Sequence, residues 1–444
     1  MSHKFIGGVH PPDKKAPANA KMAERLAAPP QVVLPVSLHI GAPCQPVVAV
    51  GDTVKLGQKI ADSPAPVSAP IHASVSGKVV AIEPRLHSNG AMVNSIVIEN
   101  DGLDTPAETM VPCPAEAAGD PDAIVAAIRE AGIVGMGGAT FPTAFKITSG
   151  KGQVNTLIIN GAECEPYISS DYRAMLERPD EVLGGIRLLM TACGVEKAHF
   201  GIEKNKQDAI DLLKGRLTAG DGIEILELVC RYPQGAEKQL VHTVTGREVP
   251  RGGLPMDTGC VVENVSTAFA VYDAVINGRP LVRRVVTVTG DAVEKPSNLL
   301  VPCGTPYADL VAACGGVKGK AAKVISGGPM MGFTVGSLTV PTGKTTSGLL
   351  LLPPGKVTCF TSQACIACGR CVDACPMRLS PAELSQCVEA DDIEGAEQVA
   401  LMDCIECGSC AFVCPARRPL VHHFRRGKAA VMARRAAAKK NAQR

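Results

Sequence analysis

Aromatic residues are scarce in this 444-residue sequence: they make up only 3% of it, and Trp is absent. A surface that stacks nucleic-acid bases needs aromatic side chains within a strongly basic groove. The formal net charge is only +2, so the sequence offers neither feature. We therefore expect no nucleic-acid partner.

Long apolar runs are also missing. No stretch approaches the roughly 18 consecutive apolar residues of a membrane-spanning helix. Residues 1–15 have no apolar core of the kind that a signal peptide requires. We expect a chain without a transmembrane helix of its own, located at the cytoplasmic face of the inner membrane as a peripheral subunit that partners hold there.

Acidic residues are absent from one long stretch, because residues 417–444 contain ten Lys or Arg and no Asp or Glu. Within it, we expect residues 425–444 to form a basic tail. Such a tail is either a solvated segment or a contact for an anionic membrane face or an acidic partner.

The rest of the composition is that of a globular chain, with 46% hydrophobic and 20% charged residues. The length predicts three or four domains. Residues 1–115 contain strand-forming runs at 47–61 and 71–82, broken by Gly and Asp turns. This pattern resembles the barrel-sandwich fold of lipoyl carrier domains. A carrier presents a modified lysine at a hairpin tip, whereas residues 73–75 here are Ala-Ser-Val, which favours a structural module over a swinging arm.

Residues 116–281 alternate between helices and strands. Helices are predicted at 122–131 and 178–193 and a buried strand at 154–159, which indicates a Rossmann-like α/β domain with a mainly parallel sheet. Residues 282–354 return to strands around a short helix at 307–314. This segment resembles the β-grasp module called SLBB, and we expect it to pack between its neighbours.

The eighteen cysteines are not expected to form disulfides in a cytoplasmic chain. Residues 365–376 (CIACGRCVDACP) and 404–415 (CIECGSCAFVCP) repeat one twelve-residue pattern. Its spacing is that of bacterial two-cluster ferredoxins, in which the fourth cysteine of each run ligates the other cluster. The predicted ligands are Cys365, Cys368, Cys371 and Cys414 for one 4Fe-4S cluster, and Cys404, Cys407, Cys410 and Cys375 for the other.

Zinc also binds four thiolates from C-x2-C pairs, but two zinc sites would leave the third and fourth cysteine of each run unexplained. Gly369 and Gly408 lie inside the loops, where a side chain would crowd the inorganic sulfurs. Short helices are predicted at 381–388 and 393–400 between the runs. We therefore expect residues 355–424 to form a helical two-cluster ferredoxin domain.

A glycine cluster, Gly135, Gly137 and Gly138, follows the helix predicted at 122–131. Glycines let the backbone approach a phosphate or a ring face closely. The spacing is not the dinucleotide fingerprint, so a plain turn remains the alternative. Polar residues 160–166 follow the predicted strand directly, at the edge where α/β folds bind ligands, and further polar clusters occur at 232–237 and 262–267.

The motifs GMGGATFPT, NGAECEP, YPQGAEK and ENVST, in this order, resemble the flavin- and NADH-binding motifs of the flavoprotein subunit of respiratory complex I. Residues 4–425, including GGVHPPDKK and HIGAPCQPVV, resemble the C subunits of Rnf complexes still more closely. Those complexes couple ferredoxin and NAD to an ion gradient. The resemblance implies FMN, NAD(H) and two 4Fe-4S clusters as cofactors, and ferredoxin and the other Rnf subunits as partners.

The resemblance also implies a set of ligand-binding residues. Gly135, Gly137 and Gly138 would lie beneath the flavin and its phosphate, with the positive charge of Lys146 nearby. The remaining implied contacts to flavin or nicotinamide are Asn160, Glu163, Glu165, Tyr232, Glu237, Asn264 and Thr267, and Phe141 would stack on the adenine. At positions 136, 162 and 236 this chain has Met, Ala and Ala, where the complex I pattern has an Arg, an acid and a Glu.

Nicotinamide exchanges a hydride, whereas each cluster exchanges one electron, so a converter is needed between them, and flavin is one. The expected function is that of an oxidoreductase subunit of the ferredoxin:NAD type, with no acid or base catalyst required of the protein. Two alternatives stay open: a cobalamin (corrin) reductase of a diol-utilising microcompartment, and a non-catalytic, cluster-bearing docking subunit.

Overall fold

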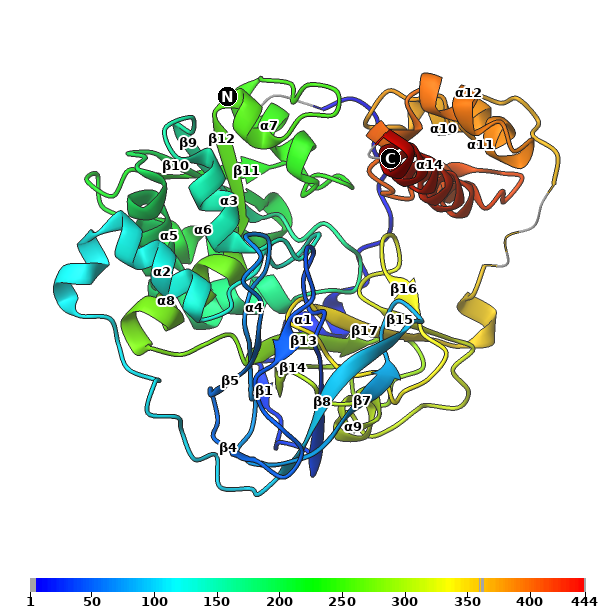
Figure 1. Cartoon of the computed structure of the whole chain (residues 1–444). Coiled ribbons are helices and arrows are strands. Elements are labelled where there is room, and N and C mark those ends of the chain that lie inside the picture. The colour runs from blue at the N-terminus through cyan, green and yellow to red at the C-terminus, as the bar shows by residue number, and fades with distance from the viewer. Residues whose placement is uncertain (1–4, 359, 361–362, 443–444) are drawn as a thin grey trace.

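The computed structural model describes residues 5–358, 360 and 363–442. Figure 1 shows a β domain in blue at the base, an α/β domain in cyan and green, a mixed β module in yellow, and a helical domain in orange and red. Among the described residues, no helix has the length and apolar character needed to cross a membrane.

The N-terminal β domain contains two antiparallel sheets around one core. The first sheet has the order β2 (Gln31–Pro35), β8 (Met92–Asn100), β7 (Gly77–Leu86) and β4 (Thr53–Val54). The second has the order β3 (Gln45–Pro46), β5 (Lys59–Asp62) and β6 (Ile71–His72). The expected Ala-Ser-Val tip is buried, and the Ser74 hydroxyl donates a hydrogen bond to the Cys303 carbonyl, 2.5 Å away. The tip therefore packs against the segment of residues 282–354, which resembles SLBB, and is not presented to solvent.

The α/β domain is built on a four-stranded parallel sheet. Its order is β11 (Ile223–Leu228), β10 (Ala198–Glu203), β9 (Thr156–Gly161) and β12 (Cys260–Asn264). One face is covered by α2 (Pro121–Glu130), α3 (Thr143–Gly150), α5 (Pro179–Cys193), α6 (Gln207–Lys214) and α8 (Val265–Asn277), and the other by α7 (Glu237–Thr245). Helix α4 (Ser170–Glu177) lies between β9 and α5 in the chain and contacts α5, α6 and α8. The predicted helices and strand correspond to α2, α5 and β9.

The SLBB-like module has a mixed six-stranded sheet and one helix, α9 (Tyr307–Ala313). The strand order is β1 (Glu24–Arg25), β14 (Ser297–Pro302), β13 (Arg283–Thr289), β17 (Gly348–Leu352), β15 (Lys323–Ser326) and β16 (Phe333–Thr334). Strand β1 comes from the N-terminal segment, after the short helix α1 (Ala16–Asn19), and pairs in parallel with β14. Strand β1, which lies within the predicted 1–115 domain, therefore belongs to the sheet of another module.

A buried lysine joins three of these parts. The Lys344 ammonium donates hydrogen bonds to the Pro70 carbonyl of the β domain and the Gly132 carbonyl of the α/β domain, at 2.6 and 2.7 Å. Burial lowers the pKa of Lys344 to about 8. Because the side chain is only 2% exposed, these contacts tie the SLBB-like module to both neighbours.

The C-terminal domain is helical. It contains α10 (Arg370–Asp373), α11 (Pro381–Glu389), α12 (Ile393–Gln398), α13 (Ser409–Val413) and α14 (Leu420–Ala442). Short 3₁₀ helices occur across the chain at Ala115–Gly119, Lys204–Lys206, Pro255–Thr258, Pro354–Lys356 and Leu401–Asp403. The helices predicted at 381–388 and 393–400 correspond to α11 and α12.

Helix α14 runs without a break across the predicted boundary between the ferredoxin domain and a basic tail at 424/425. Leu420, Phe424 and Val431 follow helical spacing and are buried in the core of the domain. On its polar face Arg425 and Lys428 both pair with Glu406. The helix is thus packed on the domain as far as Val431, whereas residues 432–438 of the basic stretch are exposed. The two interpretations of the basic tail, a solvated segment or a contact for an anionic partner, stay predictions.

Candidate flavin and iron-sulfur sites

The glycine cluster lies at the carboxyl edge of the parallel sheet. There the ends of β9 and β12 are neighbours, with Asn160 and Asn264 in register. Gly137 has a φ of +86°, and a Cβ built on it would come within 2.8 Å of the Asn264 side-chain nitrogen. Gly138 is exposed, and no heavy atom of the described residues would lie within 4 Å of its Cβ. The loop is therefore held on one side and open on the other, which fits a phosphate or ring that approaches the backbone.

Lys146 lies beside this cradle between two acids. Its ammonium donates to the Val262 carbonyl at 2.8 Å, and lies 3.4 Å from a Glu237 carboxylate oxygen and 3.6 Å from one of Glu263. Burial alone would lower the pKa of Lys146, but these two carboxylates outweigh it and raise the pKa. Glu237, the first residue of α7, is exposed over 43% of its side chain.

Glu263 is a site residue that the sequence analysis missed. It is 1% exposed, and neither carboxylate oxygen has a hydrogen-bond partner in the part of the chain that the structure describes. Burial raises its pKa, although Lys146 acts in the opposite direction. Its position directly before Asn264, within the ENVST motif, was the available signal.

Asn264 and Thr267 hold the cradle in place. The Thr267 hydroxyl accepts a hydrogen bond from the Met136 N–H at 2.9 Å. The Asn264 amide and the Ser266 hydroxyl each donate to one oxygen of Asp171, at 2.7 and 2.5 Å. Asp171, on α4, belongs to no motif and could not be singled out from the sequence.

The missing arginine at position 136 has a counterpart elsewhere in the fold. Arg284, on β13 of the SLBB-like module, is buried, and its guanidinium contacts the Met136 sulfur. A positive charge is thus present beneath the glycine loop even though position 136 itself is uncharged.

Asn160 connects two of the motifs. Its amide donates to the Gly235 carbonyl at 2.8 Å, which brings NGAECEP and YPQGAEK side by side. Phe141 is half-buried next to the loop and makes an edge contact with Phe145, with ring centroids 5.9 Å apart.

Glu163 and Glu165 are placed differently from the other predicted contacts. Glu163 accepts the Asp171 and Tyr172 N–H groups at the start of α4, and Glu165 accepts those of Met330 and Met331 in the SLBB-like module. Burial raises the pKa of each to about 7, although Lys15 lowers the pKa of Glu163 and the Met330 and Met331 N–H groups lower that of Glu165. Both carboxylates are therefore engaged by protein groups.

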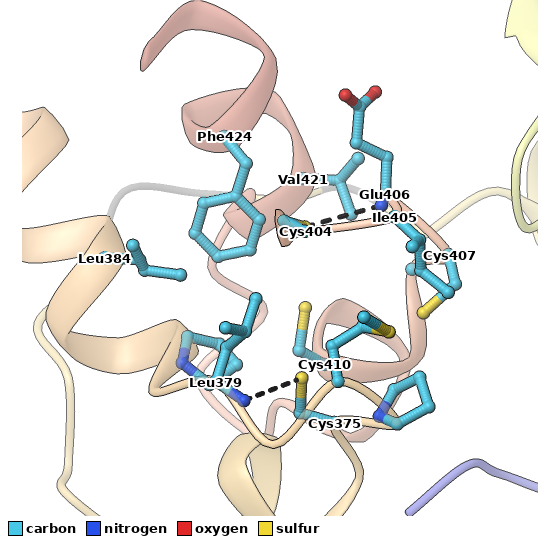
Figure 2. A pocket seen from close by; sticks show the side chains of 14 residues that line it. Cys375, Leu379, Leu384, Cys404, Ile405, Glu406, Cys407, Cys410, Val421 and Phe424 are labelled. Carbon is cyan, nitrogen blue, oxygen red and sulfur yellow. Dashed lines mark hydrogen bonds between the residues drawn. The ribbon is translucent and has the colours of Figure 1, made fainter. Parts of the chain in front are cut away.

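The predicted cluster ligands separate into two pockets. Cys375, Cys404, Cys407 and Cys410 line one, which we call the inner pocket (Figure 2). Cys365, Cys368, Cys371 and Cys414 line the other, which we call the outer pocket. In each pocket, three cysteines come from one run and the fourth comes from the other run.

The two loops share a backbone conformation that suits a cluster. Ala367 and Glu406, at equivalent positions, have φ values of 52° and 56°, and Gly369 and Gly408 have 74° and 81°. The N–H groups of Ala367 and Glu406 point at the Cys365 and Cys404 sulfurs, each at 3.4 Å. Such N–H groups stabilise the negative charge of a thiolate-bound cluster.

Burial raises the pKa of each thiol of the inner pocket, and that of Cys404 to about 12. Iron binds the thiolate, so a metal must displace these protons as it enters. Apolar side chains including Leu384, Ile405 and Phe424 complete the lining (Figure 2). The donor set and its dry surroundings fit an iron-sulfur cluster.

The inner pocket lies against the α/β domain. The Tyr232 hydroxyl donates to the Cys407 carbonyl at 2.7 Å, and the Gln239 amide donates to the Pro376 carbonyl at 3.1 Å. Cys164, from the NGAECEP motif, packs in the same apolar cluster as Tyr232 and Cys407. Tyr232 is only 2% exposed, because it is buried between the α/β domain and the ferredoxin domain.

Comparison with known families covers most of the chain. Residues 3–103 match the RnfC barrel sandwich hybrid domain, 128–273 the Nuo51 FMN-binding domain, 285–334 the SLBB domain and 359–434 the 4Fe-4S dicluster domain. The NAD+-reducing NiFe-hydrogenase in its H2-reduced state has a similar fold, with a TM-score of 0.52 and 22% identity over 75% of this chain and 69% of that chain.

Individual relatives align over almost the whole length. The C subunit of the Na(+)-translocating ferredoxin:NAD(+) oxidoreductase complex of Acetobacterium woodii is 45% identical over 97% of this chain and 98% of its own. Its proton-translocating counterpart from Clostridium ljungdahlii is 48% identical over 96% of this chain and 93% of its own. The C subunit of the ion-translocating oxidoreductase complex of Rhodobacter capsulatus is 42% identical over 98% of this chain and 84% of its own. The chain therefore belongs to the family of C subunits of ion-translocating Rnf oxidoreductase complexes.

Proposed function

We propose that this chain carries electrons between NAD(H) and the other subunits of an Rnf-type complex, through FMN and two 4Fe-4S clusters. The observation that carries the proposal is the contact between the inner cysteine pocket and the α/β domain, made by Tyr232 and Cys407. The complex would exchange electrons with ferredoxin and couple them to ion transport, with this chain bound peripherally at the cytoplasmic face of the membrane.

The glycine loop and its neighbours would hold the flavin. Gly135, Gly137 and Gly138 leave room for it at the sheet edge, Phe141 lies next to them, and Lys146 supplies a cation. When bound, FMN converts between hydride and single-electron transfer. The protein orients the cofactor and excludes water, and no side chain has to act as an acid or base.

Asn160, Glu163, Asn264 and Thr267 would act mainly by fixing the loops that form the cradle, because their polar atoms are bonded to protein groups. Glu165 and Tyr232 would hold the ferredoxin side of the site, since they contact the Met330 loop and Cys407. Glu237 keeps an exposed carboxylate at the edge and is the acid best placed to meet a nicotinamide ribose.

The positions of the two pockets support an order for the electrons. The inner cluster would be next to the flavin, and the outer cluster would follow it. Cys368 is exposed, so the outer cluster would be the one that a neighbouring protein of the complex reaches.

Anaerobic purification, cofactor analysis and titration with NADH test the proposal. We expect bound FMN, iron and sulfide for two clusters, and NADH-driven bleaching of the visible absorbance. Protein with iron and sulfide but without flavin, or without NADH-driven bleaching, would identify a cluster-bearing docking subunit instead.

A matched pair of variants locates the flavin. Gly138→Leu places a side chain in the open cradle. Gly119→Leu is the control, because Gly119 is also exposed and no heavy atom of the described chain would lie within 4 Å of its Cβ. We expect Gly138→Leu to lose flavin and keep its iron, and Gly119→Leu to keep both. Equal flavin in the two variants would place the cofactor elsewhere.

A further inference from the structure

Residues 5–15 cross from the ferredoxin domain to the α/β domain, and we call them the N-terminal strap. In Figure 1 this blue segment runs between the green and orange domains. On the α/β side, Val9 exchanges two backbone hydrogen bonds with Tyr232, at 2.8 and 2.9 Å. The Asp13 carbonyl accepts the Tyr167 N–H at 2.7 Å, and the buried Lys15 ammonium donates to the Glu163 carbonyl at 2.6 Å.

Gly7 and Gly8 of the strap contact the chain at a predicted cluster ligand. The Gly8 N–H donates to the Ala374 carbonyl at 2.9 Å, directly before Cys375. Gly7 packs so closely that a Cβ on it would lie 2.6 Å from the Cys375 carbonyl oxygen, and its φ is +78°. Both the space and the backbone conformation therefore require glycine at position 7.

The strap thus joins the two sides of the proposed electron-transfer step. Tyr232 contacts the strap through its backbone and Cys407 through its hydroxyl, while Cys375 is the ligand that the first cysteine run contributes to the inner pocket. Phe5 anchors the end of the strap, since it is buried, with the Arg231 guanidinium 5.7 Å from its ring centre.

We infer that the N-terminal strap is a positioning element that fixes the inner cluster against the flavin side, with Gly7 as its key residue. The inference rests on the proposed function and adds a determinant of the transfer rate. One NADH gives two electrons as hydride, the two clusters take one electron each, and one proton is released. The strap changes the rate of this step and not its stoichiometry.

Two alanine variants of the full chain test the inference. Gly7→Ala forces the strap away from Cys375. Gly90→Ala is the control, because Gly90 has a φ of +85° and a Cβ there would meet no described atom within 4 Å. Both variants place an alanine at a positive φ, but only the Cβ of Gly7→Ala meets the backbone of a predicted cluster ligand. Anaerobic stopped-flow mixing with NADH separates flavin reduction from cluster bleaching.

We expect Gly7→Ala to slow cluster bleaching about tenfold or more while flavin reduction keeps its rate, because small displacements between reacting groups have large effects on rate. Gly90→Ala should leave both phases unchanged. A Gly7→Ala protein that bleaches as fast as wild type would overturn the inference.

Val9→Pro gives a second, independent reading. It removes the N–H that donates to the Tyr232 carbonyl and keeps the glycines that contact Ala374 and Cys375, so we expect full iron content with the same slowing. If the Val9→Pro variant contains full iron and its clusters bleach at the wild-type rate, the inferred role of the strap is also refuted. Failure of the wild-type protein itself to bleach with NADH would instead refute the proposed function.

Discussion

The inner and outer cysteine pockets are built from the same twelve-residue motif, yet their surroundings differ. Cys375, Cys407 and Cys410 of the inner pocket are between 7% and 9% exposed, whereas Cys368 of the outer pocket is exposed. The inner pocket also contacts Tyr232 of the α/β domain. Under the proposed function, the spacing of the thiolates would select the cofactor, and the packing around each loop would set its place in the electron path.

The largest expected effect tests the crossed ligands, that is, the prediction that the fourth cysteine of each run belongs to the pocket of the other run. Cys375→Ser should remove the inner cluster and Cys414→Ser the outer one, each with loss of about half of the iron. The double variant Cys375→Ser/Cys404→Ser should lose no more iron than Cys375→Ser alone, whereas Cys375→Ser/Cys365→Ser should lose nearly all of it. Iron analysis measures the difference. If that last variant kept half its iron, the ligands would not be crossed.

The difference in exposure should appear as a difference in stability toward air. We expect the outer cluster to be lost several-fold faster than the inner one, because Cys368 is exposed whereas Cys410 is 8% exposed. Electron paramagnetic resonance of the dithionite-reduced protein, sampled during air exposure, distinguishes the two signals. Loss of both signals at one rate would show that the protein surroundings do not protect the inner site.

The contact of Glu165 with the Met330 loop should make the packing beside the inner pocket depend on pH. Burial raises the pKa of Glu165 to about 7 from 4.5. Its contribution to stability is therefore full below about pH 4.5 and declines as the pH rises toward about 7. Glu165→Gln removes this dependence, while loss of one carboxylate acceptor costs about 1 kcal/mol.

We therefore expect Glu165→Gln to be less stable than wild type at about pH 5 and to recover relative to it by about pH 8. Urea unfolding at the two pH values measures the change. Glu83→Gln, at an exposed position of β7, is the control for the replacement of a glutamate by glutamine. A difference between Glu165→Gln and wild type that is the same at both pH values would mean that the Glu165 carboxyl does not titrate in this range.

The smallest expected effect concerns one hydroxyl. Tyr232→Phe removes the hydrogen bond to the Cys407 carbonyl and should cost about 1 kcal/mol of unfolding free energy. It should also make the potential of the inner cluster slightly more negative, because a donor dipole near it is lost. Tyr307→Phe is the matched control, since its hydroxyl hydrogen-bonds Ser326 at 2.6 Å within the SLBB-like module.

Redox titrations of both tyrosine variants, monitored by electron paramagnetic resonance, measure the reduction potential of each cluster. The two changes should lower stability similarly, but only Tyr232→Phe should move a potential, and only that of the inner cluster. A shift in the reduction potentials of both clusters in Tyr232→Phe would contradict a local effect at the inner pocket.

Much of the architecture could be predicted because its signals are local. The parallel sheet follows from alternating helix and strand patterns, and the grouping of Cys375 with the second cysteine run follows from ligand spacing. The barrel-sandwich, SLBB and dicluster domains were each expected, and the family comparison confirms them.

The parts that could not be predicted depend on partners far away in the chain. Asp171 supports the cradle only because α4 packs beside the start of α8, and Arg284 reaches Met136 from a different module. Strand β1 is two residues long and carries no pattern of its own. The packing of α14 as far as Val431 could be predicted, because the spacing of Leu420, Phe424 and Val431 is helical.

The strap has a consequence for how the molecule is assembled. Gly8 is synthesised well before Ala374, which accepts its hydrogen bond. Contacts this distant in sequence close only after the intervening domains have folded. Docking of the strap is therefore a late event that requires the ferredoxin fold, and protection of the Gly8 amide from hydrogen exchange would report that the ferredoxin domain has folded against it.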